Sequence, residues 1–377
     1  MKNVLEINVD DMGFGGVFSL VKNVIEANAR NEKSDVHIDI ACIEPYEKQE
    51  NVEYLKSLGT TVHYVGFAGN KIKKQFVIMK KLCGLLKAGE YSVAHIHGDV
   101  AYKLLVYAVA SRLAGVPKII LHSHASDVDG NHRGLKKFMH YGSCLLLKAL
   151  ATDYVSCSDL ASRWMFPNVR KSRIVNINNG VDLSRFLFNE AMRSAAREKY
   201  GLGDDDFVLG HVGRFAYQKN HEFLINVFNE VHKVKPDAKL LLIGTGELEE
   251  QTRQQVTDLG LDDFVIFGGL TNEVQAAFAA MDAFLLPSHF EGLPIVGVEA
   301  QASGLPCLFA DTITREGELL DDVCFLGIGP RDAARWAKRI SALAPHTGEE
   351  RAALNAHLRA AHFDLSDTVA QFLELYK

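Results

Sequence analysis

Short runs of apolar residues alternate with longer stretches of mixed polarity along almost the whole chain. The short runs have the length and the β-branched content of buried strands. In the stretches between them, apolar residues recur every three or four positions, which is typical of helices with one buried face. Strands that are apolar throughout and separated by helices indicate parallel sheets covered on both faces. The pattern therefore predicts an α/β protein.

The predicted strands fall into two sets, a first of seven and a second of six. Two such sets with intervening helices predict two doubly wound, Rossmann-like domains. In chain order the strands are Val4–Val9, Val36–Cys42, Thr61–Val65, Val93–His97, Lys118–Leu121, Tyr154–Cys157 and Ile174–Ile177, then Phe207–Val212, Lys239–Ile243, Phe264–Phe267, Ala283–Leu286, Pro306–Phe309 and Val323–Leu326. The clearest helical stretches between them are Phe18–Ala29, Val100–Leu113, Glu222–Lys233 and Leu248–Leu259.

A chain of 377 residues is long for one hydrophobic core and comfortable for two. We expect the join near Asp182–Asn189, because the turn-rich sequence Asn178-Asn179-Gly180 precedes a polar helical stretch there. The domains are therefore expected at residues 1–182 and 183–362.

The composition, 47% hydrophobic and 23% charged, is that of an ordinary water-soluble protein. The longest apolar candidate for a membrane span, Cys144–Ala151, is far shorter than the roughly 20 residues needed, and it contains Lys148. The first residues, Lys2–Val9, have the pattern of a strand rather than of a secretion leader. Six cysteines without a Cys-x-x-Cys pair indicate reduced thiols and no structural zinc. We expect a cytoplasmic protein.

Charge is distributed unevenly. Residues 1–175 contain 23 Lys and Arg against 17 Asp and Glu, a balance of +6, whereas residues 176–377 contain 18 against 30, a balance of −12. The segment Lys71–Lys87 holds six lysines around an apolar series at helical spacing, namely Ile72, Phe76, Met79, Leu82 and Leu86. A basic amphipathic helix can lie on an anionic leaflet, so peripheral contact with the inner membrane is one hypothesis. A solvated lysine face on an ordinary helix is the other. Nucleic-acid binding is not expected, because aromatic residues do not alternate with the basic ones.

The most informative motif is the loop that follows the predicted strand Ala283–Leu286. Glu291 lies in this loop, and Glu299 follows eight positions later. We expect Pro294 to begin a helix between them, because proline loses no intrahelical hydrogen bond at the first helical position. Glu299 would then lie about 7 Å along the helix axis.

Amide donors are expected between these two carboxylates. The backbone N–H groups of Gly292 and Leu293, with those of the first helical turn, would face the same opening as Glu291 and would attract anions and sugar hydroxyls. One carboxylate could hold a sugar, the amides a diphosphate, and Glu299 a ribose diol. The alternative is a helix start that acidic residues merely stabilise.

Ligands of parallel sheets bind beyond the carboxyl ends of the strands, where several further motifs lie. Arg214 and Lys219 follow the first strand of the second set and could together neutralise a diphosphate leaving group. The glycines after the very first strand do not form a dinucleotide-binding fingerprint, because Phe18 occupies the third glycine position. The remaining candidates for lining a nucleotide pocket are Gly15, Gly16, Gly213, Gly244, Gly246, Leu270 and Thr271.

Two pairs of histidines end neighbouring strands of the first set, His95 with His97 and His122 with His124. Such a group raises the question of a metal, but no cluster of carboxylates accompanies it, and we expect none. Alternation along the strand sends His122 and His124 to one face. Which of the two belongs to an active site is left open by the spacing alone.

The chain resembles the retaining family 4 glycosyltransferases, which have the two-domain GT-B fold. The resemblance rests on the Glu-x7-Glu pattern of Glu291 and Glu299 and on four other places along the chain: Gly15-Gly16, Asn179-Gly180-Val181-Asp182, Gly213-Arg214 and Lys219. In detail the chain is most similar to bacterial exopolysaccharide and capsule enzymes of this family. The resemblance implies that the two domains face each other across a cleft and that the last helix, in residues 363–377, returns to the first domain.

The resemblance also implies roles for particular residues. Arg214 and Lys219 would grip the donor pyrophosphate, and the base would lie near Leu270 and Thr271. His124 rather than His122 would lie by the reacting sugar, and Asp127 would contact the acceptor. The implied reaction moves a hexose or N-acetylhexosamine from a nucleotide sugar, expected to be UDP-linked, to a glycan or lipid-linked glycan. It retains the anomeric configuration and uses no metal or other cofactor.

Two alternatives remain at this stage. One is another enzyme of the same fold, such as an epimerase or a phosphorylase; a phosphorylase would carry pyridoxal on a lysine and absorb near 400 nm. The other is a sugar-nucleotide-binding protein without catalysis, against which the intact Arg214, Lys219, Glu291 and Glu299 count. A dehydrogenase is disfavoured by the missing glycine fingerprint.

Overall fold

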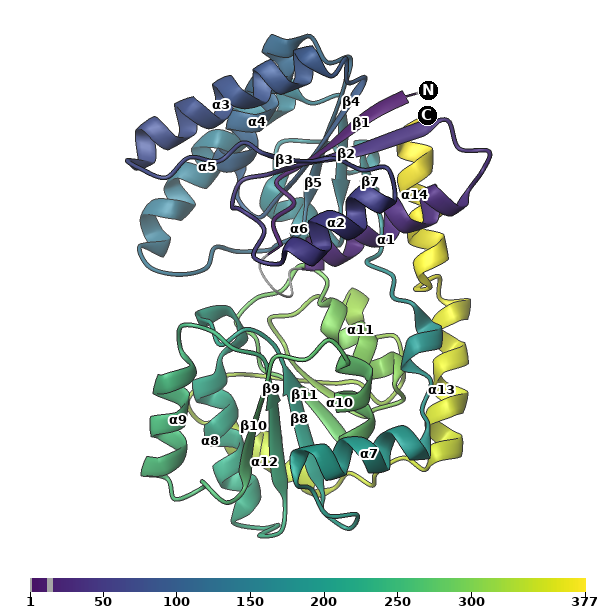
Figure 1. Ribbon diagram of the computed structural model, residues 1–377. Coiled ribbons are helices and arrows are strands. Elements are labelled where there is room, and N and C mark those ends of the chain that lie inside the picture. Colours follow the sequence, from purple (N-terminus) through teal and green to yellow (C-terminus); the bar gives the residue numbers. More distant parts are fainter. Residues whose placement is uncertain (1, 12–15) are drawn as a thin grey trace. The chain divides into compact units, whose positions relative to one another are not determined.

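The computed structural model describes residues 2–11 and 16–377. These residues form two compact units, each held together by contacts within itself (Figure 1). The first unit contains the chain up to Asn179 together with Leu365–Lys377, and the second is Gly180–Asp364. The change of unit therefore comes a few residues before the expected join. Val181 forms a parallel β-bridge with Asp364, and its N–H donates to the carbonyl of Phe363 at 3.0 Å, which places this segment in the second unit.

The first unit is built on a seven-stranded, wholly parallel sheet with the order β3-β2-β1-β4-β5-β6-β7. The order reverses direction between β1 and β4, which is the topological switch point of such a sheet. The strands are β1 (Lys2–Ile7), β2 (Val36–Cys42), β3 (Val62–Tyr64), β4 (Val93–Gly98), β5 (Lys118–Ser123), β6 (Asp153–Ser156) and β7 (Ile174–Asn176).

Helices cover both faces of this sheet because alternate strand residues are apolar on each side (Figure 1). Leu5, Ile96 and Leu121 pack against α3 (Lys71–Ala88), α4 (Ala101–Ala114) and α5 (Arg133–Leu150). Val4 and Ile120 pack against the opposite layer, which consists of α1 (Gly16–Arg30), α2 (Gln49–Ser57) and the C-terminal helix α14 (Leu365–Leu375). A short helix α6 (Asp159–Met165), capped by the Ser158 hydroxyl, and a 3₁₀ turn at Lys171–Arg173 complete the unit.

The second unit has a six-stranded parallel sheet with the order β10-β9-β8-β11-β12-β13, whose switch point lies between β8 and β11. Its strands are β8 (Val208–Val212), β9 (Lys239–Ile243), β10 (Val265–Gly269), β11 (Ala283–Leu286), β12 (Cys307–Ala310) and β13 (Cys324–Leu326). One face packs on α8 (His221–His232), α9 (Glu249–Asp258) and α12 (Ala333–Ser341). The remaining helices are α7 (Glu190–Tyr200), α10 (Val274–Ala280), α11 (Ile295–Ala302) and α13 (Gly348–Ala360), and the 3₁₀ turns are Leu183–Phe186, Tyr217–Lys219 and Arg315–Gly317.

The predicted fold class is confirmed, since each of the thirteen predicted strands is present with ends shifted by two residues or fewer. The predicted apolar series of the basic helix α3 is wrong in part. Ile78, Leu82 and Leu86 are buried, whereas Phe76 is 64% exposed. Positions 78, 82 and 86 share one face because they are four residues apart, and position 76 falls well off that face.

Within the described ranges, no helix is both long enough and apolar enough to cross a membrane. None of the six cysteines, all of which lie within the described residues, forms a disulfide. Burial raises the pKa of the Cys42 and Cys144 thiols to about 12, so these two side chains behave as apolar core residues.

Candidate active site

Lys219 and Glu291 meet beyond the switch point of the second sheet. Lys219 ends the 3₁₀ turn that follows β8, and Glu291 lies in the loop that follows β11, the strand beside β8. The Lys219 ammonium donates to Glu291 Oε1 at 2.7 Å, and the two side chains are only 16% and 8% exposed. Parallel sheets of this topology bind their ligands at this place.

Gln218 completes this ion pair. Its side-chain amide donates to Glu291 Oε2 at 3.0 Å and to the Phe290 backbone carbonyl at 3.1 Å, and its backbone carbonyl accepts from the His289 N–H at 2.8 Å. Both carboxylate oxygens of Glu291 are therefore held by donors, and the two loops are tied together. The ring of His289 stacks on that of Tyr217, with centroids 4.3 Å apart, so an aromatic surface adjoins the pair.

Arg214 is placed differently from Lys219. Its guanidinium lies 3.0 Å from the Glu247 carboxylate, and the two side chains are 60% and 51% exposed. A pair this exposed contributes at most about 1 kcal/mol, so an incoming phosphate can displace Glu247 at little cost. The candidate site thus contains two neutralised cations, one buried and one exposed. Before any ligand binds, it carries no excess positive charge from these four groups.

The glycines of the loops after β8 and β9 allow two backbones to pack closely. A Cβ on Gly244, whose φ is +136°, would lie 2.1 Å from the Gly213 carbonyl oxygen, and one on Gly246 would lie 2.5 Å from that of Phe215. Phe215 and Thr245 join the loops by a backbone hydrogen bond of 3.0 Å. These glycines therefore support the site by fixing the loops that carry Arg214.

Leu270 and Thr271 follow β10, two strands away from β8 in the same sheet. The Leu270 side chain is exposed, and the Thr271 hydroxyl accepts from the Glu273 N–H at 3.0 Å. Both residues lie at the carboxyl edge of the sheet, as expected.

The loop after β11 runs from Glu291 through Gly292 and Leu293 to α11. The helix starts at Ile295, one residue later than expected, with Pro294 as its N-cap; the Pro294 carbonyl accepts from the N–H groups of Gly297 and Val298 at 2.9 and 3.2 Å. This difference follows from the extended backbone at Pro294, whose ψ is 105°.

Glu299 lies in the middle of α11. Burial raises the pKa of its carboxyl to about 7, against a smaller lowering by Arg185 and Lys219. Near neutral pH this carboxyl is therefore divided between its acid and carboxylate forms. A group of this kind responds strongly to any ligand that donates hydrogen bonds to the carboxylate.

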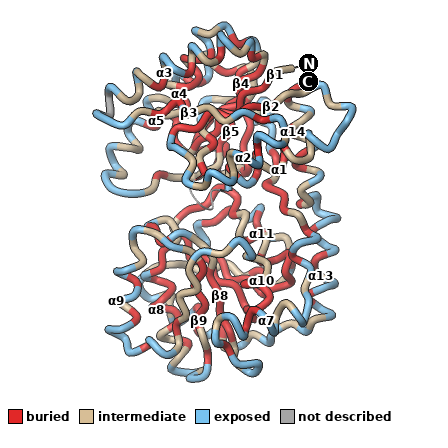
Figure 2. The backbone as a smooth tube through the Cα atoms, in the orientation of Figure 1, coloured by how far each residue is buried: buried red, intermediate tan, exposed pale blue. Residues whose placement is uncertain are grey.

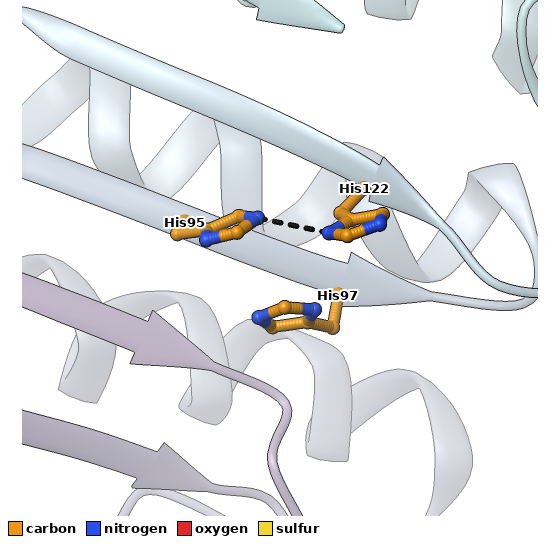
Figure 3. A group of neighbouring side chains, drawn as sticks. All are labelled: His95, His97 and His122. Atoms are coloured by element: carbon orange, nitrogen blue, oxygen red, sulfur yellow. Dashed lines mark hydrogen bonds between the residues drawn. The ribbon is translucent and has the colours of Figure 1, made fainter. Parts of the chain in front are cut away.

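A second polar cluster occupies the first unit, on the sheet face that α14 covers. Glu6 of β1, His95 and His97 of β4, and His122 of β5 are wholly buried there, where apolar residues precede them on the same strands. Figure 3 shows the three buried imidazoles side by side. His124, the first residue after β5, is partly exposed.

The hydrogen bonds of this cluster form one continuous chain. His124 Nε2 lies 2.8 Å from His97 Nδ1, and His97 Nε2 lies 2.6 Å from Glu6 Oε2. The Tyr376 hydroxyl, at the C-terminal end of the chain, donates to Glu6 Oε1. Its oxygen also lies 3.1 Å from His95 Nδ1. The last link of the network joins His95 Nε2 to His122 Nδ1, 3.1 Å apart.

Burial lowers the pKa values of three histidines in this cluster and has the opposite tendency on the carboxyl of Glu6. Burial, reinforced by the neighbouring His95, lowers the pKa of His97 to about 4, and burial holds the pKa values of His122 and His124 well below their ordinary range. Burial alone would raise the pKa of Glu6, but hydrogen bonds and charge from His95 and His97 hold it well below its ordinary value.

Ligand atoms of His95, His97 and His122 lie within 4.8 Å of one another, which is close enough to test for a metal site. Both ring nitrogens of His95 and of His97 already have protein partners, and only Nε2 of His122 lacks one among the described residues. A metal would have to break this chain of hydrogen bonds. The cluster is therefore better described as a hydrogen-bond network.

Other candidate residues have different surroundings. The rings of His122 and His124 lie on one face of the sheet, as expected, with centroids 4.1 Å apart. Of these two, His122 is wholly buried and His124 is partly exposed. Asp127 accepts from Arg133 at 2.7 Å and from Lys137 at 2.8 Å, so its carboxylate is neutralised by α5. Gly15 lies outside the described residues, and Gly16 is the first residue of α1.

Gln218, Glu6 and Tyr376 were not found from the sequence. Gln218 directly precedes Lys219 at a strand end, so its position was the available signal. Glu6 is an acidic residue between the apolar Leu5 and Ile7 of a predicted strand, which indicates a buried charge that must have partners. Nothing in the sequence links Glu6 to Tyr376, which is 370 positions away.

Comparison with known families agrees with this arrangement. The family described as "Glycosyl transferases group 1" matches residues 192–357, and "Glycosyl transferase 4-like" matches residues 24–157. The "Putative glycosyltransferase EpsF" of Bacillus subtilis (strain 168) is 30% identical over all of this chain and 96% of that protein. An Escherichia coli "UDP-Gal:alpha-D-GlcNAc-diphosphoundecaprenol alpha-1,3-galactosyltransferase" is 28% identical over 60% of this chain and 59% of its own length.

Solved structures show the same fold. Anabaena HepE in complex with UDP-glucose superposes with a TM-score of 0.79 and 20% identity over 99% of each chain. WaaG, described as a glycosyltransferase of lipopolysaccharide biosynthesis, superposes with a TM-score of 0.73 and 15% identity over 99% of each chain. At these identities the likeness is one of fold.

Proposed function

We propose that this chain, which belongs to the family 4 glycosyltransferases with the GT-B fold, transfers a hexose or N-acetylhexosamine from a UDP-sugar to a glycan or lipid-linked glycan in polysaccharide biosynthesis. The observation that carries the proposal is the ion pair of Lys219 and Glu291, held by Gln218 at the switch point of the second sheet. Support for the donor and acceptor comes from two relatives. HepE has been crystallised with UDP-glucose, and the E. coli enzyme is named for a UDP-galactose donor and a diphosphoundecaprenol-linked acceptor.

In the proposed reaction the second unit binds the donor. The ammonium of Lys219 and the guanidinium of Arg214 turn from their carboxylate partners to the diphosphate, where they stabilise the charge that develops as the leaving group departs. The Glu291 carboxylate holds the sugar and that of Glu299 the ribose hydroxyls. Lys219, Gln218 and Glu291 are already held together before the donor binds, so the donor would exchange existing contacts for new ones rather than order loose side chains.

The chemical step would be a front-face substitution that retains the anomeric configuration. The acceptor oxygen forms the new bond to the anomeric carbon as the bond from that carbon to the diphosphate oxygen breaks. The acceptor proton passes to the leaving phosphate. This route needs neither a protein nucleophile nor a metal, because the two cations and the backbone amides carry the leaving-group charge.

The proposal also places the protein at the cytoplasmic face of the inner membrane, in peripheral contact, because a lipid-linked acceptor is held there. The charge of the first half of the chain, +6, supports attraction to an anionic leaflet.

A donor screen tests the proposal. The change in melting temperature would be measured with UDP, GDP, ADP, CMP and dTDP sugars, followed by ¹H NMR of the product released from the UDP-sugar that stabilises most. We expect stabilisation by a UDP-sugar and a product with the donor's anomeric configuration, with and without EDTA. Inversion, or loss of turnover with EDTA, would refute the proposed mechanism. Tight donor binding without any transfer or hydrolysis would favour a binding protein.

A further inference from the structure

Helix α5 is apolar on the side that faces solvent as well as on the side that faces the sheet. His140, Cys144 and Leu147 are buried against the first unit. Five large apolar residues at helical spacing are exposed on the other side, among them Phe138 at 78%. We call them the α5 stripe: Leu135, Phe138, Met139, Leu145 and Leu146. A surface helix ordinarily carries polar residues there, and a continuous exposed apolar face indicates a partner.

The layer that contains α5 is strongly basic. Helix α4 packs against both α3 and α5, and Figures 1 and 2 show the three on the same side of the first unit. Together the three helices contain twelve Lys and Arg and neither Asp nor Glu. Acidic groups before these helices are paired with their cations: Asp127 is bound by Arg133 and Lys137, and Asp99 lies 3.3 Å from Lys103.

We propose that the α5 stripe docks the protein onto an anionic lipid surface. The inference rests on the proposed function only in that the acceptor is lipid-linked. Apolar side chains that enter the headgroup boundary, flanked by cations that attract anionic lipids, are what such binding requires. A second copy of the chain is the rival occupant. Its twelve cations would face an equally basic layer, so charge opposes self-association and favours the anionic leaflet.

The structure also indicates why α5 rather than α3 is the inserting helix. On α3, Lys74 pairs with Glu44 at 2.6 Å and Lys81 donates to the Gly66 carbonyl at 2.8 Å, so two of its lysines are held by the protein. Most apolar residues of α3 whose side chains are described pack inward, and Phe76 is the exposed exception. Helix α3 thus supplies charge, and α5 supplies the apolar surface.

Co-sedimentation with vesicles tests this assignment. The parent, a Phe138→Ser/Leu145→Ser variant and a control are mixed with vesicles of pure phosphatidylcholine or of phosphatidylcholine with phosphatidylglycerol. The control, Leu187→Ser/Val234→Ser, removes two exposed apolar residues of the second unit. We expect the parent and the control to bind anionic vesicles, and the α5 variant to bind at least about tenfold more weakly. Binding of the parent should fall at high salt, because the Debye length drops from about 10 Å at 0.1 M to about 3 Å at 1 M.

Three results would overturn the proposal: equal binding by the α5 variant and the parent, no preference of the parent for anionic vesicles, or a parent dimer that the α5 variant converts to monomer. UDP affinity, measured on the same samples, should not change. If docking fails while UDP binding is normal, the docking proposal is refuted and the transferase proposal stands. If the parent docks but does not bind UDP, the transferase proposal fails and the docking proposal stands.

The hydrogen-bond chain of the first unit carries a second, independent inference. Glu6 is an acceptor only, so His97 must donate to it through Nε2–H and keep a lone pair on Nδ1. His124 then donates its Nε2–H to that lone pair, which leaves its own Nδ1 unprotonated. We infer that Glu6 and His97 are positioning residues that fix the tautomer of His124, so that His124 accepts a hydrogen bond from a sugar hydroxyl. The inference rests on the proposed function of His124.

Tyr376, near the C-terminus, also belongs to this hydrogen-bond network. Its hydroxyl donates to the second oxygen of Glu6 and accepts from His95 Nδ1–H. The branch through His95 then runs to His122 and does not reach His124 through any hydrogen bond among the described residues. His122→Ala is therefore a matched control: it removes a buried histidine of the same cluster without removing a link to His124.

The test combines ¹⁵N NMR of labelled histidine with steady-state kinetics. The parent and His122→Ala should show His124 with Nδ1 unprotonated, whereas Glu6→Gln and His97→Ala should show a mixture of tautomers. In the latter two variants we expect kcat to fall about tenfold or more with the donor KM unchanged. A protonated Nδ1 of His124 in the parent would overturn the inference, and so would a normal kcat in both variants. Unchanged UDP binding in all of them would show that the donor site is intact.

Discussion

Replacing Glu299 by glutamine should stabilise the second unit at neutral and alkaline pH while impairing the proposed reaction. The carboxyl lies on α11, where burial raises its pKa from 4.5 to about 7. Glutamine has nearly the same shape and carries no charge, so it removes the cost of burying a carboxylate without leaving a cavity. The substitution therefore separates the electrostatic effect from packing.

The sign and size of the effect follow from linkage. With the folded pKa above the unfolded one, the folded state binds the proton more tightly. The contribution of Glu299 to stability is therefore full below pH 4.5 and is lost as the pH rises to about 7. At about 1.4 kcal/mol per pKa unit, the loss is about 3.5 kcal/mol, and partial exposure of the side chain makes this an upper bound. Glu299→Gln should match the parent near pH 4.5 and exceed it above about pH 7.

Two tryptophans make the measurement specific to one unit. The chain contains only Trp164, in the first unit, and Trp336, fully buried in the second. In a Trp164→Phe background, fluorescence during urea denaturation reports the unfolding of the second unit alone. The free energy of unfolding would be compared between this background and the same protein with Glu299→Gln added, at about pH 5 and about pH 8.5, where linkage predicts the smallest and largest differences.

Glu291→Gln is the matched control with the opposite sign. The Glu291 carboxylate accepts from Lys219 and Gln218, so losing its charge should cost about 1–3 kcal/mol of stability. Catalysis should separate the two as well: Glu299→Gln should raise the donor KM, and Glu291→Gln should lower kcat with less change in KM. If Glu299→Gln is no more stable than the parent at about pH 8.5, the reasoning about its buried charge is wrong; identical kinetic defects would refute the division of roles.

Three further predictions concern binding, transfer and stability. Alanine at both Arg214 and Lys219 should remove most of the thermal stabilisation by UDP, at about 1.5–3 kcal/mol per lost contact, and UDP affinity equal to the parent's, measured by calorimetry, would contradict their role. His124→Ala should reduce glycosyl transfer while leaving UDP affinity nearly intact, and a large loss of affinity would contradict its assignment to the other unit. Asp282→Ala should lower the free energy of unfolding of the second unit by about 3–5 kcal/mol, because it leaves the buried Arg197 guanidinium, now 2.9 Å from Asp282, without its counter-ion. An unchanged urea midpoint would refute that estimate.

Much of the fold could be predicted because buried parallel strands have a strong local signature. Runs such as Lys239–Ile243 and Ala283–Leu286 are apolar on both faces apart from Lys239, and their predicted ends coincide with those in the structure. Helix ends have a weaker local signature. Pro294 was expected to be the first helical residue and is the N-cap, because proline can occupy either position without losing a hydrogen bond.

The partners of candidate residues could not be predicted, because they depend on contacts between distant segments. Lys219 was expected to serve a diphosphate alone, yet in the structure its ammonium binds Glu291, 72 positions away. Arg214 was expected to act beside it, and it pairs instead with the exposed Glu247. Sequence spacing places such residues at one edge of a sheet. It does not determine which of several opposite charges at that edge will pair.

The same limitation applies to α5. Helix α5 carries apolar residues on two sides, between which its basic residues lie, and nothing in residues 133–150 indicates which apolar side is left uncovered. Only the packing of His140, Cys144 and Leu147 against the first unit shows that Phe138 and its neighbours face outward. The buried cluster around Glu6 has the reverse character, since polar residues occupy positions where the pattern predicts core. Exposed apolar side chains on α5 and buried polar side chains around Glu6 both depart from the usual burial of apolar residues, and both departures cost stability. Such departures are expected where a protein retains residues for binding or catalysis rather than for folding, and both proposals for the first unit rest on them.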